Sequence, residues 1–454
     1  MPKKQLTIEE KMNNALVPEE EWPYKLPDNW CWVRLGELFQ VNPKNNVEND
    51  DIEAAFIPMA LIDSDFSGEY SYEIKSWKEA KNGHTQFANK DVAFAKISPC
   101  FENGKAFIAN NLPNGIGAGT TELVVLRNIK IVPQYTFYLL STDRFVNGGR
   151  HTYSGVVGQQ RISMDYVKSY AFPLPPLPEQ QRIVARIESL FDKLDEAKEK
   201  IQNVLDGAES RKAAILHQAF TGKLTAKWRK ENGVMDDSWE EVTIKSLCNS
   251  LKYGTAKKSA KEGKVPVLRM GNLQNGEIDW TSLVYSNDSD DIRKYSLQNE
   301  DVLFNRTNSA ELVGKTSIYR GQQPAIYAGY LIKLDYKRDR ILGDYLNYVL
   351  NSPSAKEYCN AVKTDGVNQS NINAQKIGAF GVRLPKLSEQ KEIVRRLDNL
   401  LNKEKSICKS CEVSLAAIEA MKKAILAKAF RGELGTNNPA EESSKELLRE
   451  IISI

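Results

Sequence analysis

Apolar positions along this chain follow a helical period in two long segments. Over 174–225 and again over 384–435, they recur in alternating steps of four and three residues, the spacing by which one helix packs along another. Each segment predicts a helix of about 40 residues, or ~60 Å at the α-helical rise. The predicted contact positions, here called the seam, are Ile183, Ile187, Leu190, Leu194 and Ile201, then Ile393, Leu397, Leu400, Ile407, Ile418 and Ile425.

Polar residues interrupt both seams, and glycines mark their ends. Arg211 falls in the first seam, and Glu404 and Ser414 fall in the second. Gly222 and Gly432 are predicted to end the helices, because glycine favours the left-handed backbone that closes a helix. A stripe this narrow needs a partner helix. We expect the two helices to pair antiparallel as a coiled coil; the alternative is that each packs on its own globular region.

The two segments belong to a tandem repeat of about 210 residues. Aligned without a gap at an offset of 210, they share 20 of 52 residues, including Glu179/Glu389 and Phe220/Phe430. The offset continues upstream at scattered positions, such as Gly104-Lys105 and Gly314-Lys315. Each half is therefore a variable globular region followed by a shared helical segment.

The globular regions are predicted to be α+β. Short apolar runs at 54–57, 122–126 and 265–268 predict strands, and 135–140 and 345–350 predict helices. Strands and helices do not alternate regularly, which argues against a doubly wound parallel sheet. The predicted boundaries are an extension at 1–21, globular regions at 22–173 and 227–383, helical segments at 174–226 and 384–435, and a tail at 436–454.

Charge and cysteine content narrow the class of protein only slightly. The net charge of +3, from 62 basic and 59 acidic residues, indicates no particular partner. A lysine-rich stretch contains one acid, Glu262, and fits either a phosphate-contacting loop or a solvated one; its cations are Lys252, Lys257, Lys258, Lys261, Lys264 and Arg269. Six cysteines are sparse for 454 residues, which favours a reducing cytoplasm. Cys408 and Cys411 lie within a predicted helix, where we expect them to pack as small apolar residues.

Motifs of catalysis and of membrane insertion are missing from the sequence. Gly314-Lys315-Thr316 resembles the end of a phosphate loop, but Ser309 stands where that loop needs its first glycine. His84, His151 and His217 have no metal-ligand spacing. No apolar run reaches eighteen residues, and the N-terminus has no apolar leader. We expect no catalytic centre, no metal and no cofactor in this chain.

The shared segments resemble the conserved regions of type I restriction–modification specificity subunits. The residues that carry the resemblance are 174–184 with 222–229, and 384–390 with 432–434. Ser388 departs from the pattern, because the first copy has Pro178. The resemblance covers essentially the whole chain, since each globular region also begins near a tryptophan, Trp30 and Trp239.

That resemblance implies a function without catalysis. Each globular region would be a target-recognition domain that binds one half of a split, asymmetric sequence in double-stranded DNA. The helices would set the spacer between the halves and hold two adenine-N6 methyltransferase subunits, which ATP-dependent restriction subunits join. S-adenosylmethionine, ATP and Mg²⁺ would belong to those partners. The alternatives are an adaptor whose domains bind proteins and an enzyme in its own right.

The candidate DNA-binding residues are polar side chains in the globular regions. Residues matched between the halves, such as Lys105/Lys315 and Gln159/Gln369, are expected to hold the fold or a phosphate, and unmatched ones to contact bases. The candidates are Lys96, Ser98, Asn103, Lys105, Arg150, Gln159, Gln160 and Arg161, then Lys257, Lys258, Arg269, Asn272, Arg306, Asn308, Lys315, Asn368, Gln369 and Asn371.

The two ends of the chain carry weaker patterns. Thr7 and Glu10 predict a capped helix start. The tail from Thr436 has four apolar residues on one helical face, Leu447, Leu448, Ile451 and Ile452. This pattern fits either docking on a partner subunit or a loosely ordered terminus.

Overall fold

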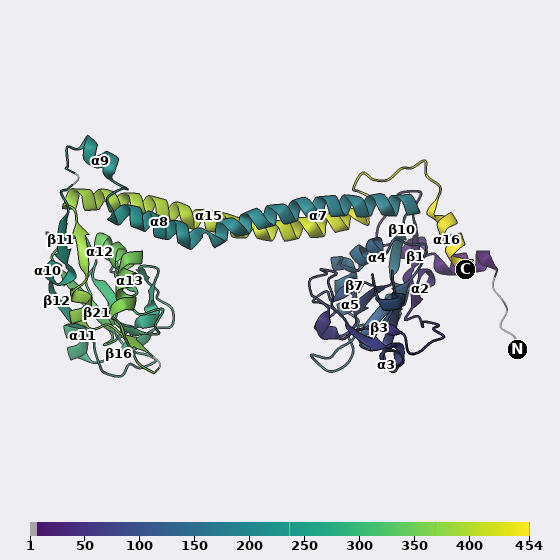
Figure 1. Cartoon of the computed structure of the whole chain (residues 1–454), viewed down its shortest axis with the longest axis horizontal. Helices are drawn as coiled ribbons and strands as arrows, with labels where there is room; N and C mark the ends of the chain where they lie inside the picture. The colour runs from purple at the N-terminus through teal and green to yellow at the C-terminus, as the bar shows by residue number, and fades with distance from the viewer. Residues whose placement is uncertain (1–6, 236, 368, 454) are drawn as a thin grey trace. The chain divides into compact units, whose positions relative to one another are not determined.

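Two structural units make up the chain, and each contains residues of both sequence repeats. The computed structural model describes residues 7–235, 237–367 and 369–453. The first unit runs to Lys200 and resumes at Ser414, and the second is Ile201–Val413 (Figure 1). Each unit therefore combines one globular domain with stretches of helix from both repeats.

The first unit contains two four-stranded sheets and a two-stranded ribbon. All neighbouring strands are antiparallel except β3 and β8, which are parallel. The sheets are β2 (Gln40–Val41), β9 (Leu123–Arg127), β6 (Val92–Ala95), β7 (Ala106–Ile108), and β4 (Glu73–Ser76), β3 (Glu53–Ile57), β8 (Ile116–Gly119), β5 (Thr85–Ala88); the ribbon is β1 (Cys31–Arg34) with β10 (Ala171–Leu174).

The second unit repeats this plan with one strand fewer in the second sheet. Its parallel strand pair, β13 with β20, matches β3 with β8. Its sheets are β12 (Cys248–Tyr253), β21 (Leu331–Tyr336), β17 (Val302–Asn305), β19 (Thr316–Ile318), and β16 (Val284–Ser286), β13 (Val265–Leu268), β20 (Ile326–Tyr327); its ribbon is β11 (Glu240–Thr243) with β24 (Gly381–Leu384). The α+β expectation is confirmed.

Short helices and hairpins complete the two domains. The helices of the first unit are α1 (Ile8–Ala15), α2 (Leu35–Leu38), α3 (Trp77–Lys81), α4 (Pro133–Leu140), α5 (Asp143–Arg150), α6 (Met164–Ser169) and α16 (Ser444–Ile452). Those of the second unit are α9 (Ala226–Glu231), α10 (Ile244–Leu247), α11 (Ser289–Tyr295), α12 (Gly343–Leu350), α13 (Pro353–Val362) and α14 (Ala374–Gly378). Its remaining strands are β14 (Leu273–Gln274), β15 (Glu277–Ile278), β18 (Thr307–Asn308), β22 (Thr364–Asp365) and β23 (Ser370–Asn371).

The first long segment contains one irregular residue, whereas the second is a single helix. Two helices, α7 (Leu177–Asp206) and α8 (Ala208–Phe220), meet at Gly207. Gly207 keeps right-handed helical backbone angles and accepts a hydrogen bond from Arg211 N–H at 3.0 Å, so the two helices together span the predicted length. In the second copy α15 (Leu387–Ala429) runs for 43 residues. Gly222 and Gly432 follow the helix ends in the left-handed conformation, with φ of 80° and 73°.

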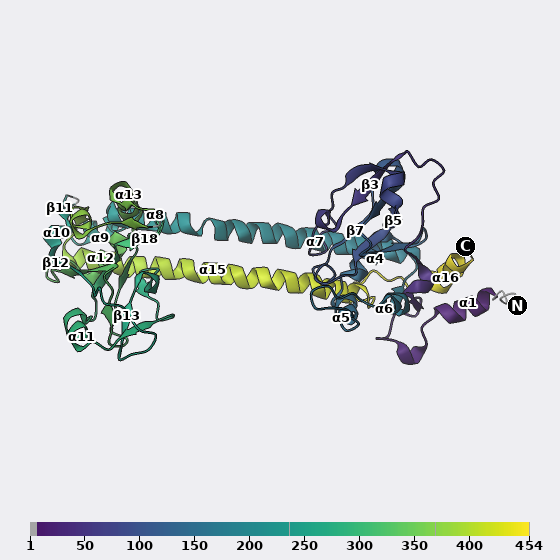
Figure 2. The same ribbon diagram turned by 90° about the horizontal axis from the view of Figure 1, so that it is seen from below.

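In each unit the long helices pair antiparallel, as the ribbons of α7 and α15 show (Figure 2). In the first unit Lys198 lies 2.8 Å from Glu419, and Lys422 pairs with Asp195, three residues back on α7. In the second unit Arg211 Nε lies 3.0 Å from Glu404 Oε2. Arg211 and Glu404, two of the three polar residues that interrupt the seams, are thus ion-paired with each other.

Most predicted seam residues are buried or half-buried, but Ile407 is not. The fully buried members include Ile183, Ile187, Ile393 and Leu397. Ile407 is 42% exposed, and its assignment to the seam is wrong. The heptad steps pass instead through the half-buried residues at 404, 408, 411 and 415, which places Cys408 and Cys411 in the seam. The three-residue spacing of these cysteines is a heptad step, and neither is in a disulfide.

The end of each long helix packs on the domain in its own unit. Phe430, at the end of α15, packs edge-on against Tyr135 of the first domain, with ring centroids 5.1 Å apart. Phe220, at the end of α8, packs in the same way against Tyr345 of the second domain, at 5.6 Å. Each domain core is therefore completed by a helix of the other repeat. Among the described residues, no helix is long and apolar enough to cross a membrane.

Candidate nucleic-acid interface

A short hairpin occurs at equivalent positions in both domains. In the first domain Ser154 and Arg161 exchange two backbone hydrogen bonds, of 3.1 and 2.9 Å, which close the loop between them. In the second, β22 and β23 pair Thr364 with Asn371. Ser154 and Thr364, and likewise Arg161 and Asn371, are 210 residues apart, so the sequence repeat extends into these loops.

The same backbone hydrogen bonds join each hairpin to the end of a central strand. Lys96 follows β6, donates its N–H to the Glu122 carbonyl at 2.8 Å and accepts from Ile162 N–H at 3.0 Å. Arg306 follows β17, donates to the Tyr330 carbonyl at 3.0 Å and accepts from Ile372 N–H at 2.9 Å. Two different sequences thus build one scaffold, which we call the hairpin scaffold.

Apolar side chains lie at the hairpin tips. Val156 and Val157 are 79% and 88% exposed, and Val367 is fully exposed. Gly155 and Gly158 flank the first tip with φ of 110° and 85°, conformations that side-chain-bearing residues rarely adopt. The domains therefore present valines to solvent at matching positions, 157 and 367.

An arginine–carboxylate pair dominates the surface of the first scaffold. Arg161 donates to both oxygens of Glu122, through Nε at 2.8 Å and Nη2 at 2.7 Å, and its Nη1 donates to the Gln159 carbonyl at 3.1 Å. These bonds from Arg161 hold the pKa of the Glu122 carboxyl below its usual value. Bidentate geometry orients the guanidinium, so Arg161 is held in place before any ligand arrives.

A second carboxylate lies beside this pair. Glu102 accepts a hydrogen bond from Ser98 Oγ at 2.8 Å and a very short one from the Tyr153 hydroxyl. Burial tends to raise the pKa of Glu102, but these bonds outweigh it and the pKa is lowered. Burial and the adjacent Glu102 raise the pKa of Tyr153. Both groups keep their ordinary charge states at neutral pH.

The second scaffold presents aromatic and amide groups instead. The Arg306 guanidinium lies 4.8 Å from the ring centroid of Tyr253 and donates to the Gly329 carbonyl at 3.3 Å. Tyr330, 47% exposed, takes the place of Glu122. Asn371 Nδ2 donates to Thr307 Oγ1 at 2.8 Å. The scaffold is shared, whereas its surface chemistry is not.

Several candidate residues are hydrogen-bonded to other groups of the protein. Lys105 donates to the carbonyls of Met59 and Ile62, at 2.9 and 2.7 Å, and Lys315 donates to Gln274 Oε1 at 3.1 Å. Asn272 is buried and donates to two backbone carbonyls. Arg269 donates to the Ser282 carbonyl. These contacts are structural, as expected for the matched pair Lys105/Lys315, and the prediction that Asn272 contacts DNA is wrong because its side chain is buried.

The remaining candidates divide by location. The first hairpin scaffold contains Lys96, Ser98, Gln159, Gln160 and Arg161. The positive charge of Arg150 helps to lower the pKa of the Glu102 carboxyl. Exposed Asn103 accepts from Asp65 N–H through its backbone carbonyl. Asn308, Gln369 and Asn371 lie on the second scaffold with Arg306. Asn368 lies outside the described residues.

The lysine-rich stretch is partly neutralised by carboxylates. Lys257 lies 2.6 Å from Asp288 and 3.5 Å from Asp291, and Lys252 lies 3.5 Å from Asp335. Within the described ranges, Lys258, Lys261 and Lys264 are exposed and form no ion pair. These three lysines remain available to a polyanion.

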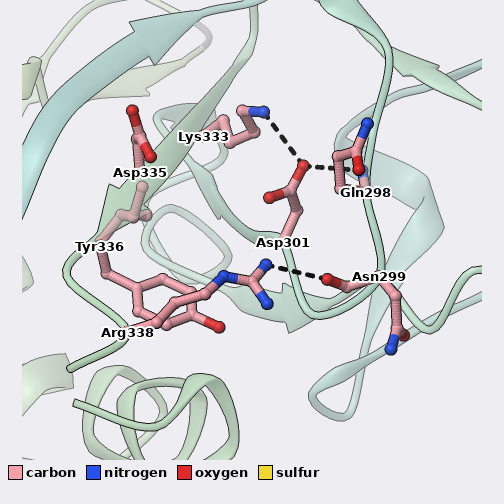
Figure 3. A pocket seen from close by; sticks show the side chains of 8 residues that line it. Gln298, Asn299, Asp301, Lys333, Asp335, Tyr336 and Arg338 are labelled. Atoms are coloured by element: carbon pink, nitrogen blue, oxygen red, sulfur yellow. Dashed lines mark hydrogen bonds and ion pairs between the residues drawn. The ribbon is translucent and has the colours of Figure 1, made fainter.

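A polar pocket lies at the end of β17 and β21 away from the hairpin scaffold, and its lining residues bond one another. Figure 3 shows Lys333 beside Asp301, at 3.0 Å, and Arg338 bonded to the Asn299 carbonyl. Asp301 also accepts from Gln298 N–H at 2.9 Å. The main charged side chains of this pocket therefore already have protein partners. In the described part of the chain, no group of His, Cys, Asp or Glu could hold a metal ion.

The start of each long helix carries a buried Glu–Gln pair that anchors surrounding segments. Gln180 Oε1 accepts from Val132 N–H at 3.0 Å, and Gln390 Oε1 accepts from Leu342 N–H at 2.9 Å, just before α4 and α12. Glu389 accepts from Thr225 at 2.6 Å, Arg229 at 2.8 Å and the Trp239 indole at 3.0 Å. These bonds explain why the repeat retains this dipeptide.

In the corresponding anchor of the first unit, the connector after the helix contributes a negative charge, whereas the connector of the second unit contributes a positive one. Glu179 accepts from Thr436 at 2.7 Å and from Arg182 at 2.6 Å, and Arg182 also pairs with Glu441 at 2.7 Å. In the second unit the connector after the helix supplies the cation, Arg229; in the first, the connector supplies the anion, Glu441. The tail from residue 436 is thus docked on the first domain, and it forms α16.

Comparison with protein families places the repeat among known DNA-recognition proteins. The family model described as the type I restriction modification DNA specificity domain matches twice, at residues 27–206 and 236–409. The chain belongs to this specificity family. Its two globular domains are therefore the first and second specificity domains, as the resemblance of the shared segments predicted.

Individual relatives agree with the family assignment. The EcoAI specificity subunit of Escherichia coli is 38% identical over half of this chain, and the EcoKI specificity subunit of strain K12 is 31% identical over 62%. This chain covers 38% and 42% of the length of the EcoAI and EcoEI subunits. The HsdS subunit of Thermoanaerobacter tengcongensis has a similar fold, with a TM-score of 0.67 at 21% identity over 91% of this chain and 99% of that one.

Several surface groups of the specificity domains escaped the sequence analysis. Glu102, Glu122 and Tyr330 belong to the hairpin scaffolds, and so do the tip valines. A search restricted to cations and amides passes over carboxylates and apolar residues. The repeat does match Val157 with Val367 at an offset of 210, but this match alone does not show that both side chains are exposed.

Proposed function

We propose that this chain is the DNA sequence-recognition subunit of a type I restriction–modification complex. It binds a bipartite, asymmetric target, and each specificity domain contacts one half-site through its hairpin scaffold. One observation carries the proposal: two domains share a backbone scaffold, while Arg161 and Glu122 on one become Asn371 and Tyr330 on the other. A shared frame with different hydrogen-bonding groups suits two different base sequences.

The long helices act in this proposal as a spacer and a platform. Antiparallel pairing within each unit makes a stiff element, and stiffness is needed to select one distance along a duplex. Equivalent helix surfaces from the two repeats would hold two copies of one adenine-N6 methyltransferase subunit, and ATP-dependent restriction subunits would join them. Exposed apolar residues on the helices, Val204, Ile407, Val413 and Met421, support a protein-docking role.

The chemistry of modification belongs to the partner subunits. S-adenosylmethionine, ATP and Mg²⁺ would be bound there, and this chain would contribute recognition and assembly. Methylating an adenine within a duplex requires that the base leave the stack and enter the methyltransferase pocket. The chain therefore acts by placing those pockets over a chosen sequence, and the complex would work in the cytoplasm beside the DNA that it protects.

Mapping of methylated adenines tests the proposal directly. The full chain is co-expressed with its methyltransferase subunits in a host that lacks them, and the methylome is sequenced. We expect one motif of two unlike blocks separated by a fixed spacer; the control omits this chain and should show no such motif. Methylation that is independent of the chain would reject the proposal, as would methyl transfer by the purified chain alone.

A further inference from the structure

Positions 161 and 371 are equivalent and carry different hydrogen-bonding side chains. Both close a hairpin, and both pair with the segment that leaves a central strand, Arg161 with Ile97 and Asn371 with Thr307. The backbone is therefore fixed at both positions. Only the side chain differs, which makes the two residues a matched pair for comparing what each domain recognises.

Arg161 is oriented and still has donors to offer. Its guanidinium has five N–H groups; Nε and one N–H each of Nη1 and Nη2 are used by Glu122 and the Gln159 carbonyl. Two N–H groups remain, one on each terminal nitrogen, and the side chain is 44% exposed. Arginine typically recognises guanine through two such donors, to O6 and N7. Since Glu122 already holds the side chain, little further ordering is needed on binding.

Asn371 is oriented in a comparable way. One amide N–H bonds Thr307 Oγ1, and within the described residues no group donates to its amide oxygen. The second N–H and the oxygen form the pair that asparagine uses on adenine N7 and N6. Tyr330 takes the place that Glu122 has in the first domain, and the described hydrogen bonds and ion pairs include none between Asn371 and a carboxylate.

We propose that residues 161 and 371 are corresponding base-specificity positions, and that Arg161 recognises a guanine in one half-site and Asn371 an adenine in the other. The inference rests on the proposed function of the domains in DNA recognition. It adds which residue selects a base in each half-site, and which base each selects.

Selection from randomised duplex DNA tests this assignment. The full chain in complex with its methyltransferase subunits selects binders from a randomised pool, and the motif of each variant is sequenced. Arg161→Ala should reduce the preference for guanine at one position of one block by about 10- to 100-fold. Asn371→Ala should do the same for one adenine in the other block. Arg161→Asn and Asn371→Arg should change those preferences to adenine and guanine.

Two controls separate base recognition from charge and folding. Arg161→Lys keeps the charge and a partner for Glu122 but loses the two-donor edge, so the guanine preference should fall while affinity is largely kept. Arg449→Ala removes another exposed arginine of the first unit, one paired with Glu446 at 3.2 Å, and should leave the motif unchanged. Unfolding midpoints of all variants should stay close to wild type.

The outcomes distinguish this inference from the proposed function. If the wild-type complex selects no sequence, the proposed function itself fails. If it selects a two-block motif that neither Arg161→Ala nor Asn371→Ala alters, the specificity assignment is wrong and the proposed function stands. If either variant alters both blocks, the domains do not recognise bases independently, and the assignment is also overturned.

Discussion

The two anchors at the helix starts and the two hairpin scaffolds follow opposite rules. At the anchors the side chains are retained, with Glu179 and Gln180 matched by Glu389 and Gln390, all buried. At the scaffolds the backbone bonds are retained and the exposed side chains differ. The comparison shows where each kind of similarity is needed: buried polar groups must keep their exact partners to avoid unpaired charge, whereas exposed groups are free to specify different ligands.

The largest expected effect is the loss of a buried anchor. Glu389→Ala removes the buried carboxylate that accepts hydrogen bonds from Thr225, Arg229 and the Trp239 indole, and should destabilise the second domain by about 3–5 kcal/mol. Hydrogen exchange resolved by domain measures this without assuming that the whole chain unfolds in one step. Glu179→Ala should cost less, about 1–3 kcal/mol, because Arg182 is 38% exposed and keeps Glu441. If the two substitutions lowered the stability of their domains equally, the proposed difference between the two anchors would be wrong.

The docked tail provides the next test. Leu448 of α16 is fully buried in the core of the first domain, and Leu448→Ala should cost about 2–5 kcal/mol there while leaving the second domain unchanged. Exchange rates in both domains measure the effect. Lys445→Ala, a neighbouring exposed residue, is the control. Protection of the first domain that survives Leu448→Ala would show that the tail does not contribute to its stability.

Substitution of the hairpin tips should affect binding without affecting stability. Val157→Ser and Val367→Ser remove exposed apolar groups, so the free energy of unfolding should change by less than about 0.5 kcal/mol. If the tips contact DNA, affinity for the selected duplex should fall by roughly fivefold, the effect of losing about one kcal/mol of apolar contact. Fluorescence anisotropy measures this, with Ile129→Ser as the control, because Ile129 is an exposed apolar residue of the first domain outside the hairpin scaffold. An unchanged affinity would show that the hairpin tips do not contact the DNA.

The smallest expected effect is a pH dependence at the start of α15. Hydrogen bonds from Arg395, aided by Arg396, lower the pKa of Glu392 to about 2 from 4.5. A carboxyl whose pKa is lowered by folding stabilises the fold above its unfolded pKa, and this contribution is lost as the pH falls from 4.5 toward 2. Glu392→Gln should remove that part of the acid sensitivity at a cost below ~1 kcal/mol near neutrality. Identical acid profiles for variant and wild type would contradict the lowered pKa.

The sequence was sufficient for the repeat and the fold class because both depend on periodic apolar residues. It failed locally at Ile407, which lies one residue from the heptad position that Cys408 fills. The phase of the seam is decided by packing against the partner helix, which one sequence does not specify.

The candidate interface was only partly predictable for a different reason. Arg161 and Asn371 were among the candidates, but so were Lys105 and Asn272, which have the same polar character. The structure separates them by what each donor bonds, two backbone carbonyls for Lys105 and a carboxylate on an exposed surface for Arg161. Such partners come from residues distant in the chain, and only the fold brings them together.

The reversed charge at the two anchors has a consequence during folding. A newly made chain offers each helix start two similar connectors, and docking the wrong one would trap the repeat in a misassembled state. Glu441 brought to the second anchor would face Glu389 in the place of Arg229, and Arg229 brought to the first would face Arg182 in the place of Glu441. Like charges would repel in both mismatched arrangements and attract in the native pair. The opposite charges of the two connectors thus favour the native pairing of each connector with its own anchor.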